Sequence, residues 1–221
     1  MINKRGINIG TYDTAIKGWT LAGLTFSDPV TVTNIVDVPG RRKGPLDLSA
    51  ALTDGDPVYG NRTLTAVFEC SEGTREDREE IISEMINELS GYIHNIKLPD
   101  DSKHYITGRV SVARLYNDLA HGSVQVTATC EPWRYAKEET KVMLECRQDV
   151  LTATLPNQGR LAVVPSLTVI GGEVALIFDG ATHKLSPGTY ALPDLLLPRG
   201  GKKISYNGVG VVVLTYREAI L

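Results

Sequence analysis

The chain has 221 residues, of which 42% are hydrophobic and 22% are charged, so it is long enough for one large domain or two small ones. Its net charge of −3 excludes the strongly basic class of nucleic-acid-binding proteins, and we expect no specific nucleic-acid binding. Met1–Gly6 precedes no apolar run, and no segment approaches the length of a membrane span, so we expect neither a signal peptide nor a membrane segment. Three cysteines without CxxC spacing predict neither a disulfide framework nor a zinc site, and they suit folding in a reducing cytoplasm.

The first third of the chain predicts a β-sheet with one face on a core. Residues 19–26 and 30–36 are rich in β-forming residues and are separated by a turn at residues 27–29. In the next strand apolar residues alternate with polar ones, which places one set on a buried face. The inward set is Leu64, Ala66, Phe68 and Cys70.

Residues 74–90 predict one amphipathic helix. Thr74 is a natural N-cap, and Asp77 three residues later completes a capping box. Acidic residues fill the first turns, where the helix dipole favours them, and Gly91 ends the helix. The apolar stripe that would pack on a sheet is Ile81, Ile82, Met85, Ile86 and Leu89.

A long hairpin follows, with strands at residues 104–116 and 123–130 around a turn at 117–121. Cys70 and Cys130 fall next to apolar neighbours on strands and are predicted to be small core residues. Pro132 lacks an N–H group, so we expect the sheet to end there.

The last part of the chain predicts a second, smaller β-domain. Residues 136–160 have the mixed pattern of a crossover, and short strand patterns separated by tight turns follow at residues 161–170, 173–179, 203–206 and 209–217. We therefore predict a mainly β protein in two domains. Residues 1–137 form a β-rich α+β domain with the helix at 74–90, and residues 138–221 form a small β-sandwich.

Catalytic, cofactor-binding and metal-binding motifs are absent from the sequence. The four histidines have no metal-ligand spacing to one another or to a cysteine. His94 and His104 flank Asp100 and Asp101, but a solvated hairpin end explains this group better than a His/Asp site does. The pattern predicts a protein that is not an enzyme and has no cofactor.

Residues 39–61 form a long connection that contains residues suited to burial. Connections longer than about 12–15 residues are uncommon in compact domains and are usually functional or disordered. This one carries apolar residues and a cationic tip, so it either docks on a neighbouring subunit or folds back on its own subunit as a hairpin. For the docking alternative, the predicted contact residues are Arg41, Arg42, Leu46, Leu48, Tyr59 and Arg62.

Trp133 and Tyr135 allow two interpretations. An exposed aromatic side chain on a β-sandwich is a common platform for a sugar ring, so the chain is alternatively a carbohydrate-binding module for attachment to a host surface. Burial of the two side chains at the seam between the domains is the favoured interpretation, because Glu-Pro-Trp-Arg-Tyr directly ends the first domain.

The order and spacing of several segments resemble the distal tail proteins of long-tailed bacteriophages over essentially the whole chain. In the first domain these segments are Val38-Pro-Gly-Arg, Leu46-Asp-Leu48, Tyr59-Gly-Asn-Arg62, Leu98-Pro-Asp-Asp101 and Cys130-Glu-Pro-Trp-Arg-Tyr135. In the second they are Pro165-Ser-Leu-Thr-Val169, Pro187-Gly-Thr-Tyr190 and Tyr216-Arg-Glu218. The resemblance lies in their arrangement and not in any one motif.

This resemblance implies a structural protein of the virion tail tip, assembled in the host cytoplasm. Its N-terminal domain would close into a homo-hexameric ring between the tail tube protein and the tail-tip hub protein, around a channel through which DNA passes. The C-terminal domain would be galectin-like and would project outward, where some relatives dock a receptor-binding protein. Contractile tails, tail-derived bacteriocins and tube-initiator proteins remain alternatives within the same structural class.

Overall fold

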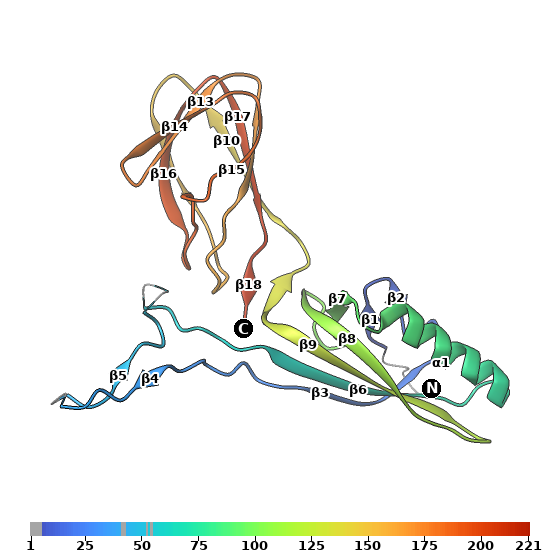
Figure 1. Cartoon of the computed structure of the whole chain (residues 1–221). Helices are drawn as coiled ribbons and strands as arrows, with labels where there is room; N and C mark the ends of the chain where they lie inside the picture. Colours follow the sequence, from blue (N-terminus) through green and yellow to red (C-terminus); the bar gives the residue numbers. More distant parts are fainter. Residues whose placement is uncertain (1–5, 41–42, 52, 54) are drawn as a thin grey trace. The chain divides into compact units, whose positions relative to one another are not determined.

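The computed structural model describes residues 6–40, 43–51, 53 and 55–221, and within them it is mainly β with one α-helix. This confirms the predicted fold class. The chain divides into two compact units, Met1–Pro132 and Trp133–Leu221 (Figure 1). The domain boundary predicted after residue 137 stays a prediction.

The first unit is built on a sheet with the strand order β2-β1-β7-β8-β9-β6-β3. Its strands are β1 (Asn8–Ile9), β2 (Tyr12–Asp13), β3 (Thr20–Phe26), β6 (Arg62–Cys70), β7 (Ile93–Lys97), β8 (His104–Asn117) and β9 (Gly122–Ala136). On β6 every second residue from Arg62 to Cys70 is buried, as the alternation predicts. Cys70 and Cys130 both lie in the core, and burial raises the pKa of the Cys130 thiol to about 11.

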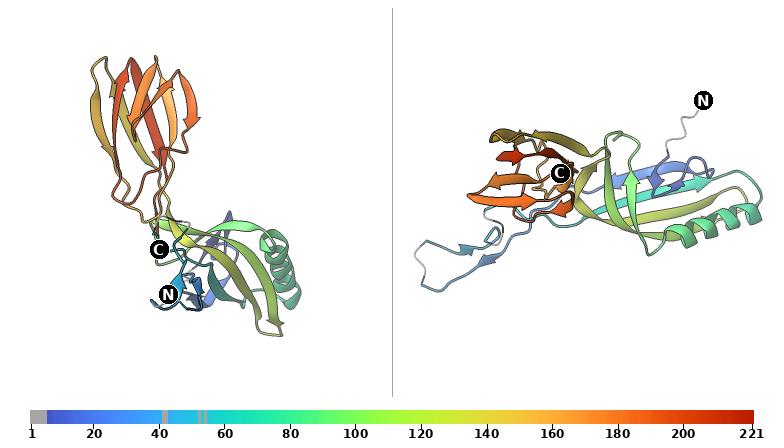
Figure 2. Two further views of the ribbon diagram at one scale, coloured as in Figure 1. Left: turned by 60° about the vertical axis from the view of Figure 1, so that its left-hand side comes forward. Right: turned by 90° about the horizontal axis from the view of Figure 1, so that it is seen from above.

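Helix α1 (Arg75–Leu89) covers one face of this sheet and packs along β8 (Figure 2). The predicted capping box is present, because Asp77 N donates to Thr74 Oγ1 at 3.2 Å and Thr74 N donates to the Asp77 carboxylate at 2.8 Å. Gly91 follows the helix with a φ of 89°. Ile82, Met85 and Leu89 are buried on the sheet side.

One buried cation on α1 was not predicted from the sequence. Arg78 is 2% exposed, and its guanidinium donates to Gly73 O at 2.8 Å and to Asp118 O at 2.9 Å. It therefore ties the start of the helix to the turn between β8 and β9. The apolar pattern could not show this role, because Arg78 stands among charged residues of the first turns.

The prediction that the sheet ends at Pro132 is wrong, because β9 runs on to Ala136. The pairing with β6 covers residues 122–130 only, and β18 (Ala219–Ile220) pairs with Arg134 and Tyr135. Pro132 thus lies between two pairing partners, where its missing N–H group removes no bond to β6.

The second unit is a sandwich of two four-stranded antiparallel sheets with a shared apolar core (Figure 2). One sheet has the order β10 (Thr140–Cys146), β17 (Gly210–Tyr216), β12 (Ser166–Ile170), β15 (Gly188–Ala191). The other has the order β11 (Leu151–Leu155), β16 (Lys202–Gly208), β13 (Val174–Phe178), β14 (Ala181–Leu185).

The predicted crossover at residues 136–160 is wrong, since it contains β10 and β11. Each of these is an edge strand of its sheet and mixes charged or hydroxyl side chains with apolar ones, strictly alternating on β11 and interrupted on β10 by the outward Met143. Edge strands carry such residues because a charge there prevents edge-to-edge association. The mixed composition therefore hid two short strands.

We predict that Tyr12→Phe destabilises the first unit by about 1–3 kcal/mol. Trp19 Nε1 donates to Tyr12 Oη at 3.0 Å, and both side chains are at most 1% exposed, so the variant leaves a buried indole N–H without an acceptor. Burial raises the pKa of Tyr12 to about 12, in keeping with a neutral hydroxyl in the core. Urea unfolding measures the loss. Tyr92→Phe, at a site 61% exposed, is the control and should unfold as the wild type does.

Candidate functional site

The predicted long connection is a two-stranded ribbon that continues β3 and β6 beyond the sheet, and we call residues 27–61 the arm (Figure 1). β4 (Ile35–Val36) pairs with β5 (Leu46–Asp47), and a bridge joins Thr31 to Tyr59. Further backbone bonds run along the ribbon, from Val32 N to Val58 O at 2.8 Å and from Leu48 N to Asn34 O at 2.8 Å. The backbone of the arm is thus bonded to itself, without a third strand.

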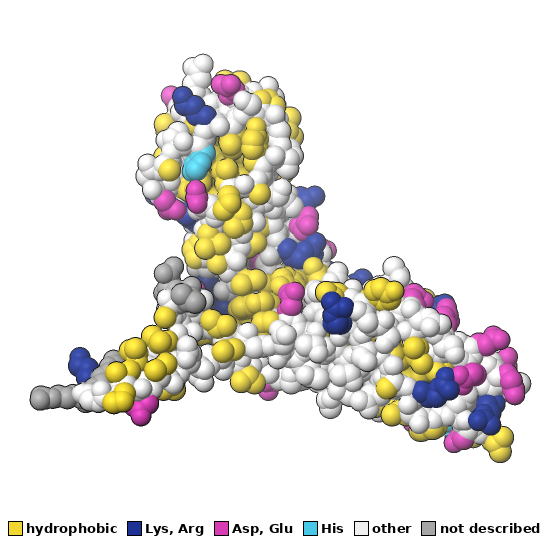
Figure 3. Space-filling view, in the orientation of Figure 1, with side chains coloured by type: hydrophobic (Ala, Val, Ile, Leu, Met, Phe, Trp, Pro, Cys, Tyr) yellow, Lys and Arg dark blue, Asp and Glu magenta, His cyan; other side chains and the backbone are white. Residues whose placement is uncertain are grey.

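Side chains along the arm are exposed to an unusual degree. Residues 30–40 are all exposed, so this strand of the ribbon does not rest on the rest of the first unit. Apolar side chains cover the arm in Figure 3. The large ones, with their exposed fractions, are Val30 (69%), Val32 (47%), Ile35 (62%), Val36 (40%), Val38 (39%), Leu48 (36%) and Val58 (38%).

Hydrogen bonds and one cation–π contact hold the base of the arm, where Ser27 meets Arg62 and Thr63. Ser27 N donates to Thr63 O at 2.9 Å, and Thr63 N donates to Ser27 Oγ at 2.8 Å. Arg62 is 5% exposed, donates from Nε to Ser27 O at 2.7 Å, and stacks its guanidinium 3.7 Å from the centre of the Phe26 ring. The arm therefore leaves the sheet from a fixed point.

The predicted contact residues fall at different places on the arm. Leu48 is exposed, Leu46 and Tyr59 are half-buried, and Arg62 is buried at the base of the arm. Arg41 and Arg42 lie outside the described residues. Sequence reasoning did not select Val30, Val32, Ile35 and Val36, although they alternate or cluster as β-formers in a segment predicted as a strand.

The arm agrees with part of each sequence alternative. It is a hairpin, as the second alternative expected, but its residues 30–40 do not pack on the rest of the first unit. Docking on a neighbouring subunit, the first alternative, stays a prediction. An isolated two-stranded hairpin is at best marginally stable in water, and an apolar patch on a soluble protein usually marks an interaction site. The arm is therefore the candidate functional site of the first unit.

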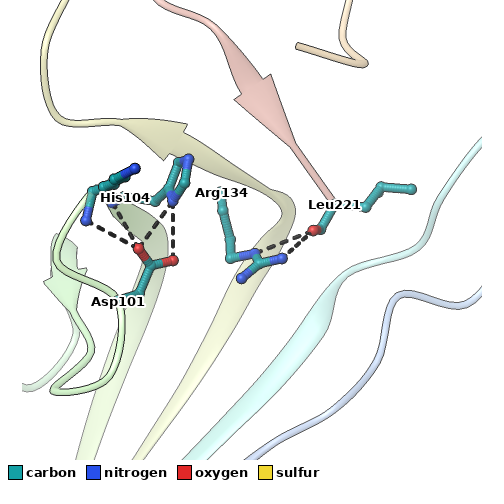
Figure 4. Close-up of polar contacts among 5 residues, drawn as sticks. Asp101, His104, Arg134 and Leu221 are labelled. Atoms are coloured by element: carbon teal, nitrogen blue, oxygen red, sulfur yellow. Dashed lines mark hydrogen bonds and ion pairs between the residues drawn. The ribbon is translucent and has the colours of Figure 1, made fainter. Parts of the chain in front are cut away.

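Trp133 and Tyr135 lie half-buried at the start of the second unit, on the last residues of β9. Here the C-terminus of the chain is fastened to β9: Ala219 pairs with Tyr135, and Arg134 donates from Nε and Nη2 to Leu221 O at 3.1 and 2.5 Å (Figure 4). Arg217 donates to the carbonyls of Ala136 and Lys137, both at 2.6 Å. These bonds fix the chain where the second unit begins.

The histidine–aspartate group is a turn stabilised by hydrogen bonds. Asp101 Oδ1 accepts from Lys103 N at 3.1 Å and from His104 N at 3.0 Å, and it lies 2.9 Å from His104 Nδ1 (Figure 4). Among the described residues, no three His, Cys, Asp or Glu side chains are grouped so that they could hold a metal ion. In the same part of the chain, no helix is long and apolar enough to cross a membrane.

Comparison with solved structures identifies the fold. The model superposes on the crystal structure of the Dit protein (gp 19.1) of phage SPP1 with a TM-score of 0.68, covering 98% of this chain and 99% of that one at 12% identity. The chain has the fold of SPP1 Dit. That protein is described as a paradigm of the hub adsorption apparatus in phages that infect Gram-positive bacteria.

Other comparisons add little to this. A chain of the native gene transfer agent particle matches 58% of the present chain, and 94% of its own length, at 15% identity with a TM-score of 0.32. A TM-score this low supports no conclusion about fold or function. No family model and no curated protein sequence matches the chain.

We predict that Asp101→Asn lowers stability at neutral pH by less than about 1 kcal/mol, because the turn is partly exposed. Burial alone would raise the pKa of Asp101, but the hydrogen bonds from His104 and Lys103 outweigh it and lower the pKa below the ordinary 3.8. A lowered folded-state pKa stabilises the fold above the unfolded-state value, and the contribution disappears as pH falls through the folded-state value. Unfolding free energies measured from neutral to acid pH should therefore converge for variant and wild type. A difference independent of pH would contradict this.

Proposed function

We propose that the chain is a structural protein of a phage tail tip, a distal tail protein whose copies form a six-membered ring. The ring would join the tail tube protein on one side to the tail-tip hub protein on the other, around a channel for DNA. The second unit, galectin-like in this proposal, would face outward and offer a place for a receptor-binding protein. No catalytic step and no cofactor belongs to this function.

The arm is the observation that carries the proposal. A ribbon whose residues 30–40 are all exposed has apolar side chains that the rest of the first unit does not cover, and in this proposal another molecule covers them. The fold of SPP1 Dit, matched along nearly the whole of both chains, supports a second copy as that molecule. A surface that binds a different surface on the next copy makes a heterologous contact, which closes into a ring when the rotation allows it.

In this proposal the contact residues have separate roles. Val32, Ile35 and Leu48 on the arm would enter the neighbouring subunit, since their side chains are exposed. Arg41 and Arg42 would add positive charge to the contact. Arg62 is buried at the base, so it would fix the direction of the arm and would not itself reach the neighbour. The domain boundary near residues 132–138 would separate the ring from the outward unit.

We predict that Ile35→Asp weakens ring formation by at least about tenfold, because it places a charge in an apolar contact. Ile35 is 62% exposed in the single chain, so the variant should unfold like the wild type. Ile16→Asp is the matched control: Ile16 is 82% exposed in the same unit but outside the arm. Sedimentation velocity over a concentration series gives the association constant of each variant.

The result that contradicts the arm's role is equal weakening by Ile35→Asp and Ile16→Asp, or no effect of either. Deleting residues 42–56 gives a second test that does not depend on one side chain. If that deletion left a ring of unchanged mass and stability, the contact would lie elsewhere on the chain.

A further inference from the structure

The outward face of the β10-β17-β12-β15 sheet carries a group of apolar side chains. On β17 the side chains of Val212, Leu214 and Tyr216 point into the core, so those of Val211, Val213 and Thr215 point outward. The register aligns three outward rows across the strands: Glu145–Val211–Ile170, Met143–Val213–Thr168 and Lys141–Thr215–Ser166. The first and second rows bring four apolar side chains together.

These side chains are exposed although they are large. Met143 is 67% exposed and Ile170 is 55% exposed, while Val211 and Val213 between them are half-buried. The outward face of the other sheet is more polar: one row is Thr152–Ser205–Ile177–Thr182, in which Ile177 is the single apolar side chain. The group of outward apolar side chains is thus a property of one sheet and not of the sandwich in general.

Charge on β10 is arranged symmetrically about Met143. Lys141 and Glu145 are each two residues from Met143, on the same face of the same strand, and both are exposed. Consider a twofold axis that lies in the plane of the interface and runs across the strands through the Met143–Val213 row. It would bring Met143 against Met143 of a second copy, and Lys141 against Glu145 of that copy, twice over.

We propose that this face pairs two copies of the chain, with Met143 at the centre and two Lys141–Glu145 ion pairs beside it. Sheets pack face to face about 10 Å apart, a distance that lysine and glutamate side chains span together. About this axis Met143 and Val213 meet their own symmetry mates, and Val211 and Ile170 face Thr215 and Ser166 of the second copy. The charge pairs on either side of the middle row fix the register. This contact is distinct from that of the arm, and it does not depend on the ring.

Cysteine cross-linking of the full chain tests the position of the twofold axis. Met143→Cys places a thiol opposite its own symmetry mate across a sheet spacing of about 10 Å, which is too wide for a disulfide. A bis-maleimide linker of about that span should therefore convert the variant to a covalent dimer on a denaturing gel. Thr182→Cys, on the outward face of the other sheet and also exposed, is the matched control and should link at least about tenfold more slowly. Cys70, Cys130 and Cys146 are buried in both variants.

Charge exchange tests the register in the same Met143→Cys background. Lys141→Glu alone and Glu145→Lys alone each create two like-charge contacts, and each should slow linking about tenfold. The double variant Lys141→Glu/Glu145→Lys restores opposite charges across the axis and should recover the original rate. Only a self-complementary face gives this recovery.

Three results would overturn the proposal: linking at position 143 no faster than at position 182, single charge variants without effect, or no recovery in the double variant. Repeating the linking with Ile35→Asp added separates the two contacts. Pairing through this face persists when the ring is lost, whereas linking that disappears with the ring reflects only the crowding of subunits within it.

Discussion

A two-stranded ribbon that leaves its own sheet is the constraint on which this structure depends. Each strand of a two-stranded ribbon hydrogen-bonds its backbone N–H and C=O groups along one edge only. Both faces of the ribbon remain in water. In the arm these faces carry valine and isoleucine side chains that are mostly exposed. Such a ribbon gains stability when another molecule covers it, so in the proposed ring the arm would couple the fold of one chain to its association with the next.

The rest of the first unit holds the arm in a defined direction. β3 and β6 pair within the sheet and continue into the two strands of the arm, and Arg62 locks the point of exit against Phe26 and Ser27. Helix α1 covers one face of that sheet, and the buried Arg78 joins its first turn to the β8–β9 turn. A rigid sheet with a projecting ribbon presents the same contact geometry in every copy, as a closed ring requires.

Local patterns predicted local structure well. The sequence predicted the capping box at Thr74 and Asp77, the alternation along β6 and the core cysteines. Each of these depends on neighbours in sequence or on the period of one strand. The strand beyond Pro132 was missed because its partner β18 is more than 80 residues away. β10 and β11 were missed because edge strands mix polar and apolar residues. The form of the arm was left open, since its composition does not tell a projecting hairpin from one that folds back.

The molar mass of the purified wild-type chain across a concentration range tests the central claim most directly, and light scattering after size exclusion measures it. The account predicts a species that rises towards six copies of 24.0 kDa, about 144 kDa, with chains paired through their sandwich faces as a separate species. A mass that stays at that of one chain at all concentrations would contradict self-assembly through the arm. Continued growth without a limit would replace the closed ring by an open stack.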